Sequence, residues 1–295
     1  MMQIALHTHP GPRENLEDAA QAVVIQSSLP SPAEAAILVL ADGVGGCNKG
    51  EVASRLAVQL ILSHLMIQIN ALLLDPGSAN PDKVLDILSQ AIAEANQIIC
   101  EQAHGECAGM ATTIVCGVIL GSILFVAWAG DSRMYRHHNG KLQRLTRDHS
   151  ELQRRVDAGE IPACSASDYP FAHRIHRYLG DPERGQPEFH VSPLEPGNII
   201  ILCSDGLPDV LTDDQINNVI ARYASEKDFS NLPVGLVTQA LDHGTQDNVT
   251  VLCGRYQPQA TFGSFSLGQT LTGVYPMAAA QAIRHIHTLT KGVFQ

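Results

Sequence analysis

The chain has 295 residues, of which 45% are hydrophobic and 17% are charged. This composition is typical of a globular protein that buries a sizeable core, and it excludes a disordered chain. The formal net charge of -11 argues against nucleic acid or an anionic membrane as the main partner. Phosphorylated substrates remain compatible with this acidity if carboxylates hold cations at the site.

The cysteines and the N-terminal residues indicate the cellular compartment in which the protein is expected. The chain has seven cysteines without a CxxC pair, and Cys116, Cys203 and Cys253 lie in apolar runs. We expect free thiols in a reducing cytoplasm. The N-terminal sequence lacks the basic and apolar segments of a signal peptide. Polar residues interrupt the apolar stretch 56–74, which predicts a buried helix rather than a membrane span.

Short apolar runs bounded by Gly, Pro, Asp or Ser predict strands, and amphipathic stretches between them predict helices. The predicted strands are 3–8, 20–25, 37–41, 111–120, 123–129, 133–138, 199–203 and 248–255. The predicted helices are 50–70, 81–103, 212–223 and 232–243. Asn139-Gly140 is a hairpin-turn signal, Thr212 with Gln215 matches a capping box, and Gly244 is a C-cap candidate. Strands in hairpin order with helices between them predict an α+β fold with an antiparallel sheet core.

These elements predict one domain over residues 1–256. Within it, residues 146–190 carry little strand pattern and are interpreted as a large surface insertion. Its arginines form either a solvated face or a docking surface for an acidic or phosphorylated partner. They are Arg154, Arg155, Arg174, Arg177 and Arg184. Residues 257–295 are interpreted as a tail, a linker followed by a short helix-like piece.

Acidic residues stand where apolar strands end. The runs "ILVLADG", "FVAWAGDS" and "IIILCSDG" end in Asp42, Asp131 and Asp205, and Asp247 precedes a fourth strand. An aspartate at a strand end projects from rigid backbone. Several converging carboxylates repel one another unless a cation neutralises them. Their oxygens are ligands that hard cations prefer, so the pattern indicates Mg²⁺ or Mn²⁺.

An isolated Asp-Gly is chiefly a hairpin-turn signal. Asp42-Gly43 and Asp205-Gly206, however, each lead into a predicted helix instead of a second strand. The segment "DGVGGCNKG" also invites a dinucleotide-binding interpretation, but Asn48 occupies the place of the third glycine, and no Gly-Lys-Ser/Thr follows. The joint occurrence of several acids at strand ends therefore favours the metal site.

With these motifs, the sequence resembles the metal-dependent protein phosphatases of type 2C, in their bacterial short form. The resemblance runs in order from about Gly11 to Arg255. Its motifs are "GPRENLEDA", "LVLADGVGG" followed by "GEVAS", "GMATTIV", "WAGDSRMYR", "LTRDHS", "ILCSDGLPDVL" and "GTQDNVTVL". The family fold implied is two packed antiparallel sheets flanked by helices, with a flap after "LTRDHS", where the insertion lies.

The resemblance implies a ligand set for two core ions, Mn²⁺ or Mg²⁺, and a weaker third. Asp42 would bridge the two core ions, and the Gly43 carbonyl would bind the first. Asp205 and Asp247 would bind the second, and Asp131 would help to hold the third. Two cations about 4 Å apart lower the pKa of a bridging water, giving a hydroxide that attacks phosphorus without a phosphoenzyme.

Three further residues receive roles from the resemblance. Arg13 would grip the substrate phosphate, which a guanidinium can do bidentately. Asp18 would hold metal-bound waters, and Asn248 would support the Asp247 loop. The implied function is hydrolysis of phosphoserine and phosphothreonine in proteins, opposing a bacterial-type Ser/Thr kinase.

Three positions depart from the family pattern. Leu16 stands where Asn commonly precedes the Glu-Asp pair, Ala111 replaces the usual Gly of "GMGTT", and Cys47 stands where many bacterial members carry His. These changes affect the expected rate and pH profile more than the reaction class. They leave open a phosphoprotein-binding module that has lost turnover. A metal phosphohydrolase acting on small metabolites is the third interpretation.

Overall fold

The computed structural model describes residues 2–28, 33–44, 49–161, 174–223 and 229–257. Its strands are β1 (Gln3–His9), β2 (Asp18–Ser27), β3 (Ala33–Asp42), β4 (Ile114–Leu120), β5 (Ile123–Ala129), β6 (Arg133–His138), β7 (Lys141–Arg144), β8 (Glu188–Pro193), β9 (Ile199–Cys203) and β10 (Val249–Arg255). Its helices are α1 (Gly50–Leu74), α2 (Pro81–Gln102), α3 (Glu151–Asp157), α4 (Asp213–Tyr223) and α5 (Asn231–Asp242).

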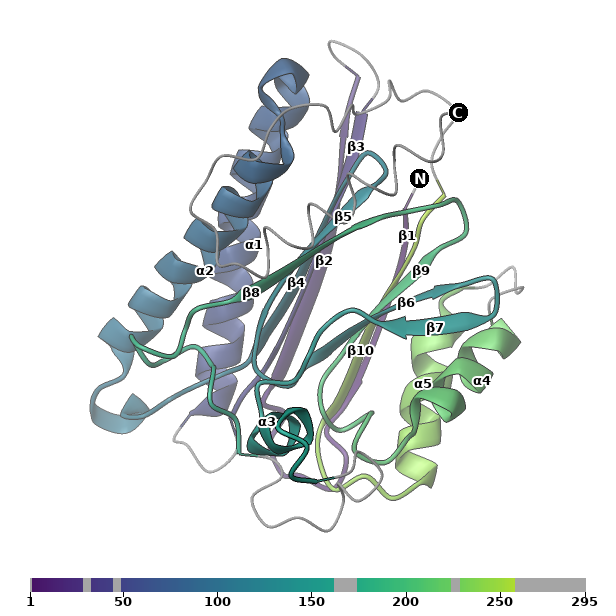
Figure 1. The fold of residues 1–295 in the computed structure, drawn as a ribbon. Coiled ribbons are helices and arrows are strands. Elements are labelled where there is room, and N and C mark those ends of the chain that lie inside the picture. The colour runs from purple at the N-terminus through teal and green to yellow at the C-terminus, as the bar shows by residue number, and fades with distance from the viewer. Residues whose placement is uncertain (1, 29–32, 45–48, 162–173, 224–228, 258–295) are drawn as a thin grey trace.

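The strands form two five-stranded sheets in which every pairing is antiparallel. We call them sheet A, with the order β1-β10-β9-β6-β7, and sheet B, with the order β2-β3-β4-β5-β8. Helices α1 and α2 cover sheet B, and α4 and α5 lie on the opposite side of the molecule against sheet A (Figure 1). The predicted α+β class and the two packed antiparallel sheets flanked by helices are confirmed.

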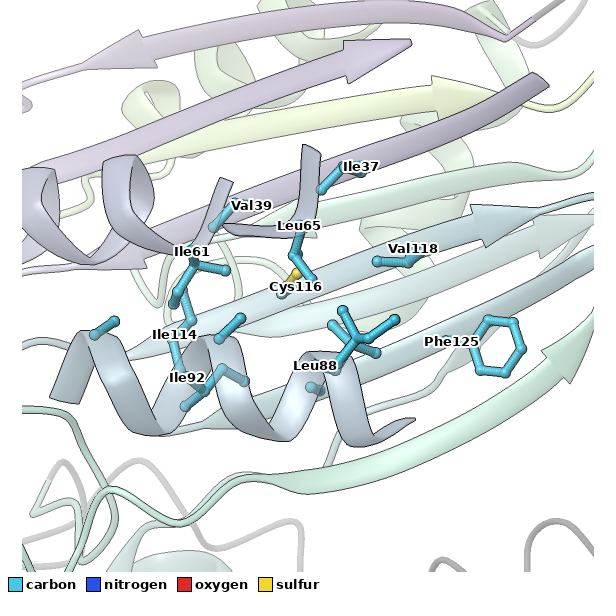
Figure 2. Close-up of a cluster of buried hydrophobic side chains, with 14 of the residues drawn as sticks. Ile37, Val39, Ile61, Leu65, Leu88, Ile92, Ile114, Cys116, Val118 and Phe125 are labelled. Atoms are coloured by element: carbon cyan, nitrogen blue, oxygen red, sulfur yellow. The ribbon is translucent and has the colours of Figure 1, made fainter. Parts of the chain in front are cut away.

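Strand β3 shows why the layers form. Ile37 and Val39 point into the cluster beneath α1 and α2, whereas Leu38 and Leu40 belong to the cluster between the sheets. Successive residues of a strand point to opposite faces, so a strand that is apolar at every position is buried on both sides. Figure 2 shows the helix-side cluster, in which Ile61 and Leu65 of α1 face the sheet.

Helix α1 is long and apolar enough to cross a membrane by length and composition, and it is the one such helix in the described part of the chain. Here it packs against β2, β3 and α2. Its buried side chains include Ile61, Leu65 and Ile69, although Ile67 at 69% exposure faces outward. This packing agrees with the interpretation of α1 as a helix of the core.

Several local predictions are confirmed. Strands β5, β6 and β9 have the predicted bounds. Asn139 and Gly140 both adopt positive φ, as a tight hairpin turn between β6 and β7 requires. The capping box at α4 forms, since the Gln215 N–H donates to Thr212 Oγ1 and the Thr212 N–H donates to Gln215 Oε1. Gly244 ends α5 with φ 78°.

Other elements were missed or misplaced. Strand β4 begins at Ile114 rather than 111, and Thr112 before it forms only isolated bridges, with Gly43 and with Leu179. The two edge strands β7 and β8 were not predicted. Strand β8 lies at the end of the predicted insertion, where its mixed residues form a strand because β5 offers a free edge.

Helix α3 was also missed within the insertion. Ser150 caps it by accepting the Gln153 N–H, and Glu151 pairs with both Arg154 and Arg155. Arg177 and Arg184 likewise pair with acids, Glu188 and Asp181. These internal pairs favour a solvated face over a docking surface. Residues 162–173 and the tail after Gln257 lie outside the described residues, so the domain limits stay a prediction.

Candidate active site

A pocket of about 800 Å³ lies at the end of the sandwich where β1, β3, β5 and β9 finish and β2 and β10 begin. Five acidic residues at or near these strand ends face it: Glu17, Asp42, Asp131, Asp205 and Asp247. Arg13, Gly43 and Asn248 also line it. The structure therefore brings together every predicted site residue except Asp18, which lies just behind the lining.

Asp18 and Asp42 are brought together by strand register. Asp18 opens β2, Asp42 closes β3, and the two residues are paired opposite each other. The Asp18 carboxylate is buried and accepts a 2.7 Å hydrogen bond from the hydroxyl of Ser204. Because Ser204 follows β9 in sheet A, this bond joins the two sheets behind the pocket.

Asn248 holds two loops at the pocket. Its side-chain amide donates to the carbonyls of Pro10 and Asn15, at 2.8 and 3.0 Å, and its Oδ1 accepts the Glu17 N–H. Its backbone N–H donates to Asp247 Oδ1 at 2.8 Å. One side chain thus fixes the loop that carries Arg13 to the loop that carries Asp247.

Arg13 lies at the rim of the pocket, where its side chain is 51% exposed. Its guanidinium donates to Asp247 Oδ2 at 2.7 Å, and its Nε donates to the Gln246 carbonyl. The predicted phosphate-gripping residue therefore neutralises a predicted metal ligand in this structure. An exposed pair of this kind is weak, so an anion or a cation entering the pocket can compete for either partner.

The carboxylates raise one another's pKa. Burial and then the charges of Asp205, Asp18 and Asp131 hold the pKa of Asp42 well above its ordinary value. Burial and then the charges of Asp131, Asp209 and Asp247 do the same to the pKa of Asp205. Burial raises the pKa of Asp18 to about 6. Burial followed by the charges of Asp148 and Asp209 raises the pKa of Asp131 to about 7. Such a cluster favours a bound cation, which relieves both the repulsion and the desolvation.

Unsatisfied oxygens support the fit of this donor set to a divalent cation. Oδ1 of Asp18 and Oδ1 of Asp205 are buried without a hydrogen-bond partner, an arrangement that is costly unless something else binds them. The donors are all oxygens, as Mg²⁺ and Mn²⁺ prefer. Among the described residues, no three His, Cys, Asp or Glu side chains are already grouped closely enough to hold an ion.

Asp209 is a site residue that the sequence analysis missed. It lines the pocket, and its charge raises the pKa of both Asp131 and Asp205. Its backbone N–H donates to the Asp205 carbonyl at 3.0 Å, a single helical turn after the strand end. The spacing of four residues in "SDGLPD" was the available signal, because it places two acids on one side of a turn.

Two of the three departures from the family pattern, Ala111 and Leu16, lie among the described residues. Ala111 is buried, and its carbonyl accepts the Val44 N–H at 3.0 Å, so the fold accommodates its methyl group. Leu16 is half-buried in the loop between Arg13 and Asp18. Cys47 lies outside the described residues.

Comparisons with known proteins agree with this geometry. Residues 17–234 match the family model of Protein phosphatase 2C. The chain is 32% identical over 218 residues to the serine/threonine phosphatase stp of Listeria welshimeri, an alignment that covers 73% of this chain and 82% of the relative. It is 33% identical over 222 residues to PstP of Mycobacterium tuberculosis, covering 75% of this chain and 40% of the relative.

Solved structures give the same result for the fold. The serine/threonine phosphatase of S. agalactiae superimposes with a TM-score of 0.72 at 27% identity, over 87% of this chain and 100% of that one. The catalytic domain of PstP in complex with two manganese ions superimposes with a TM-score of 0.69 at 28% identity, over 87% and 99%. The chain therefore belongs to the protein phosphatase 2C family and is a metal-dependent protein serine/threonine phosphatase.

Proposed function

We propose that this phosphatase hydrolyses phosphoserine and phosphothreonine in proteins with a metal-activated water in the pocket described above, and that it opposes a Ser/Thr kinase in the cytoplasm. The observation that carries the proposal is the gathering of acids from five separate segments around one pocket, with a buried oxygen of Asp205 and one of Asp18 behind the lining that both lack a hydrogen-bond partner. Free thiols at the five described cysteines agree with a reducing compartment.

The resemblance to the family supplies the ligand assignment, and the oxygen donors at the pocket fit it. Asp42 and the Gly43 carbonyl would hold a first ion, and Asp42, Asp205 and Asp247 a second. Asp131 would help to hold a third, more weakly. When bound, these cations lower the pKa of water and neutralise charge on the phosphoryl group. Asp18, fixed by Ser204, would orient water in the pocket.

Arg13 would supply the contact with the substrate phosphate. Its guanidinium lies at the rim of the pocket and pairs with Asp247. We infer that a phosphoryl group takes over this guanidinium, because two parallel charge-assisted hydrogen bonds to phosphate are stronger than one exposed contact to a carboxylate. A cation bound by the Asp247 carboxylate would likewise compete with this contact, which would leave the guanidinium free for phosphate.

The test compares substrates under metal control. Purified protein is assayed with phosphoserine and phosphothreonine peptides, with p-nitrophenyl phosphate and with small phosphorylated metabolites, each with Mn²⁺, with Mg²⁺ and with EDTA. We expect turnover of phosphopeptides that requires the cation. Turnover restricted to small metabolites would overturn the proposed substrate class, and binding of phosphopeptide without turnover would favour the regulatory module.

Opposition to a kinase needs a test in cells. Phosphoproteins that accumulate when the gene is deleted should include proteins that lose phosphate when a Ser/Thr kinase of the same cell is deleted. Reintroduction of Asp205→Asn should fail to reverse the accumulation, whereas wild type should reverse it. No overlap between the two sets of phosphoproteins would contradict the proposed opposition.

A further inference from the structure

Thr113, in the motif "GMATTIV", has no role in the reaction as described so far, yet it lies between two of the proposed ligands. Its hydroxyl oxygen accepts the Asp42 N–H at 3.0 Å and forms a 2.7 Å hydrogen bond with the hydroxyl of Ser132. Asp42 ends β3, and Ser132 directly follows Asp131. The hydroxyl thus joins segments that are 71 and 19 residues away from it in sequence.

The backbone of Asp42 is held at both of its polar groups. Its N–H is bound by Thr113 Oγ1, and its carbonyl accepts the Thr113 N–H and the Thr112 hydroxyl, each at 2.8 Å. All these partners lie on one segment, immediately before β4. Because the contacts involve only the backbone of Asp42, its carboxylate stays available to face the pocket.

The hydrogen bond between the Thr113 and Ser132 hydroxyls, called the bridge from here on, is equally constrained on the side of Asp131. Gly130 packs directly on Thr113, and a Cβ at Gly130 would lie 2.6 Å from the Thr113 Cβ, closer than real contacts permit. His149 holds the same glycine twice, since its backbone N–H donates to the Gly130 carbonyl at 2.9 Å and its Nδ1 accepts the Gly130 N–H at 3.1 Å. The loop with Asp131 therefore sits at a defined position relative to Thr113.

The bridge is also shielded from water. Thr113 is 3% exposed and Ser132 is 1% exposed. Removing one of these hydroxyls therefore leaves a buried polar group without its partner, which costs more than losing an ordinary surface hydrogen bond. The residues that orient metal ligands from behind commonly affect metal affinity as strongly as 10- to 100-fold.

We propose that Thr113 is a positioning residue whose hydroxyl, with that of Ser132, fixes Asp42 relative to Asp131 and so couples the tight cation sites to the weaker one. The inference rests on the proposed ligand roles of Asp42 and Asp131. It assigns distinct effects to the two hydroxyls. Loss of the Thr113 hydroxyl disturbs both ligands, whereas loss of the Ser132 hydroxyl leaves the Asp42 contacts intact and disturbs only the Asp131 side.

The experiment uses the full chain and four variants. Thr113→Val removes the hydroxyl at nearly constant shape, Thr113→Ser retains it, and Ser132→Ala cuts the bridge at its other end. Thr146→Val is the matched control, because Thr146 is also buried and its hydroxyl also accepts a backbone N–H, that of Met134 at 3.0 Å. The readouts are Mn²⁺ binding by calorimetry, the Mn²⁺ dependence of p-nitrophenyl phosphate turnover, and the melting temperature in EDTA.

We expect Thr113→Val to weaken tight Mn²⁺ binding by about 10- to 100-fold and Thr113→Ser to restore it. Ser132→Ala should keep the tight binding of wild type but need more Mn²⁺ for half-maximal turnover. Thr146→Val should melt earlier with unchanged Mn²⁺ binding. If Thr113→Val does not fold, the Mn²⁺ dependence of turnover in Ser132→Ala still decides whether the hydrogen bond between the two hydroxyls matters.

Three results would overturn the inference. The first is wild-type Mn²⁺ binding by Thr113→Val. The second is equal weakening of Mn²⁺ binding by Thr146→Val, which would make the effect one of general stability. The third is an unchanged Mn²⁺ dependence of turnover in Ser132→Ala. A failure of the proposed function would look different. Wild type would then bind Mn²⁺ but show no Mn²⁺-dependent turnover, and the calorimetric comparison of the variants would still test the positioning role of Thr113. If wild type binds no Mn²⁺, both the proposed function and this inference are wrong.

Discussion

Replacing Asp131 by Asn should stabilise the metal-free protein at neutral and alkaline pH while it lowers turnover. Burial and the charges of Asp148 and Asp209 raise the pKa of Asp131 from 3.8 to about 7. The carboxylate of this residue is therefore unfavourable in the folded protein when no cation is bound. An asparagine has nearly the same shape without the charge, so the substitution removes the penalty together with the proposed ligand.

The sign and size follow from linkage between protonation and folding. The folded protein holds the Asp131 proton more tightly than the unfolded chain, so the penalty is absent below about pH 3.8, grows as the pH rises, and levels off above the folded pKa of about 7. At about 1.36 kcal/mol per pH unit, a slope that falls off near the folded pKa, the free energy of unfolding of the variant should gain about 2 kcal/mol on that of wild type between pH 5 and pH 7.

The assay is urea unfolding in EDTA at several pH values from 5 to 8, with both proteins in parallel. The comparison cancels groups common to both, including His190, whose pKa burial and Arg136 lower to about 4 and whose effect has the opposite slope. Asp75→Asn, at an exposed position after α1, controls for the loss of one charge. Calorimetry should show both tight Mn²⁺ sites intact in Asp131→Asn, and turnover should fall severely.

This reasoning would be refuted if the difference in free energy of unfolding between Asp131→Asn and wild type did not change with pH. A variant that is less stable than wild type at pH 8 would also refute it, since Asp131 would then be stabilised by its surroundings rather than crowded by like charges. An emptied tight site would instead show that the ligand assignment is wrong.

Three further substitutions test the remaining roles. Asp205→Asn should lose one tight Mn²⁺ site and nearly all turnover with the fold intact; turnover like that of wild type would remove Asp205 from the site. Arg13→Ala should lower kcat/KM by about 10- to 100-fold, with KM rising for phosphopeptide and p-nitrophenyl phosphate alike; an unchanged KM for both would assign the phosphate contact elsewhere. Cys47→Ala should keep most activity, because the chemistry needs no thiolate; loss to background with metals bound would identify a nucleophile.

Strong local signals in the sequence determined much of the fold. Strands β5 and β9 are buried apolar runs bounded by glycine, aspartate or asparagine, and β6 lies between Asp131 and the Asn139-Gly140 turn, so the ends of all three are set by neighbouring residues. The capping box of α4 and the Asn139-Gly140 turn depend on contacts within a few residues. Acids at strand ends could be recognised for the same reason, because strand and acid are adjacent in the chain.

Only the tertiary structure decided what depends on partners distant in sequence. Strand β8 is a strand because β5 has a free edge beside it, and its own residues alternate too weakly to predict this. Asp18 lies against Asp42 because of the register between β2 and β3. The role of Thr113 likewise follows from the meeting of three strand ends at one buried hydroxyl, which no local pattern of residues encodes.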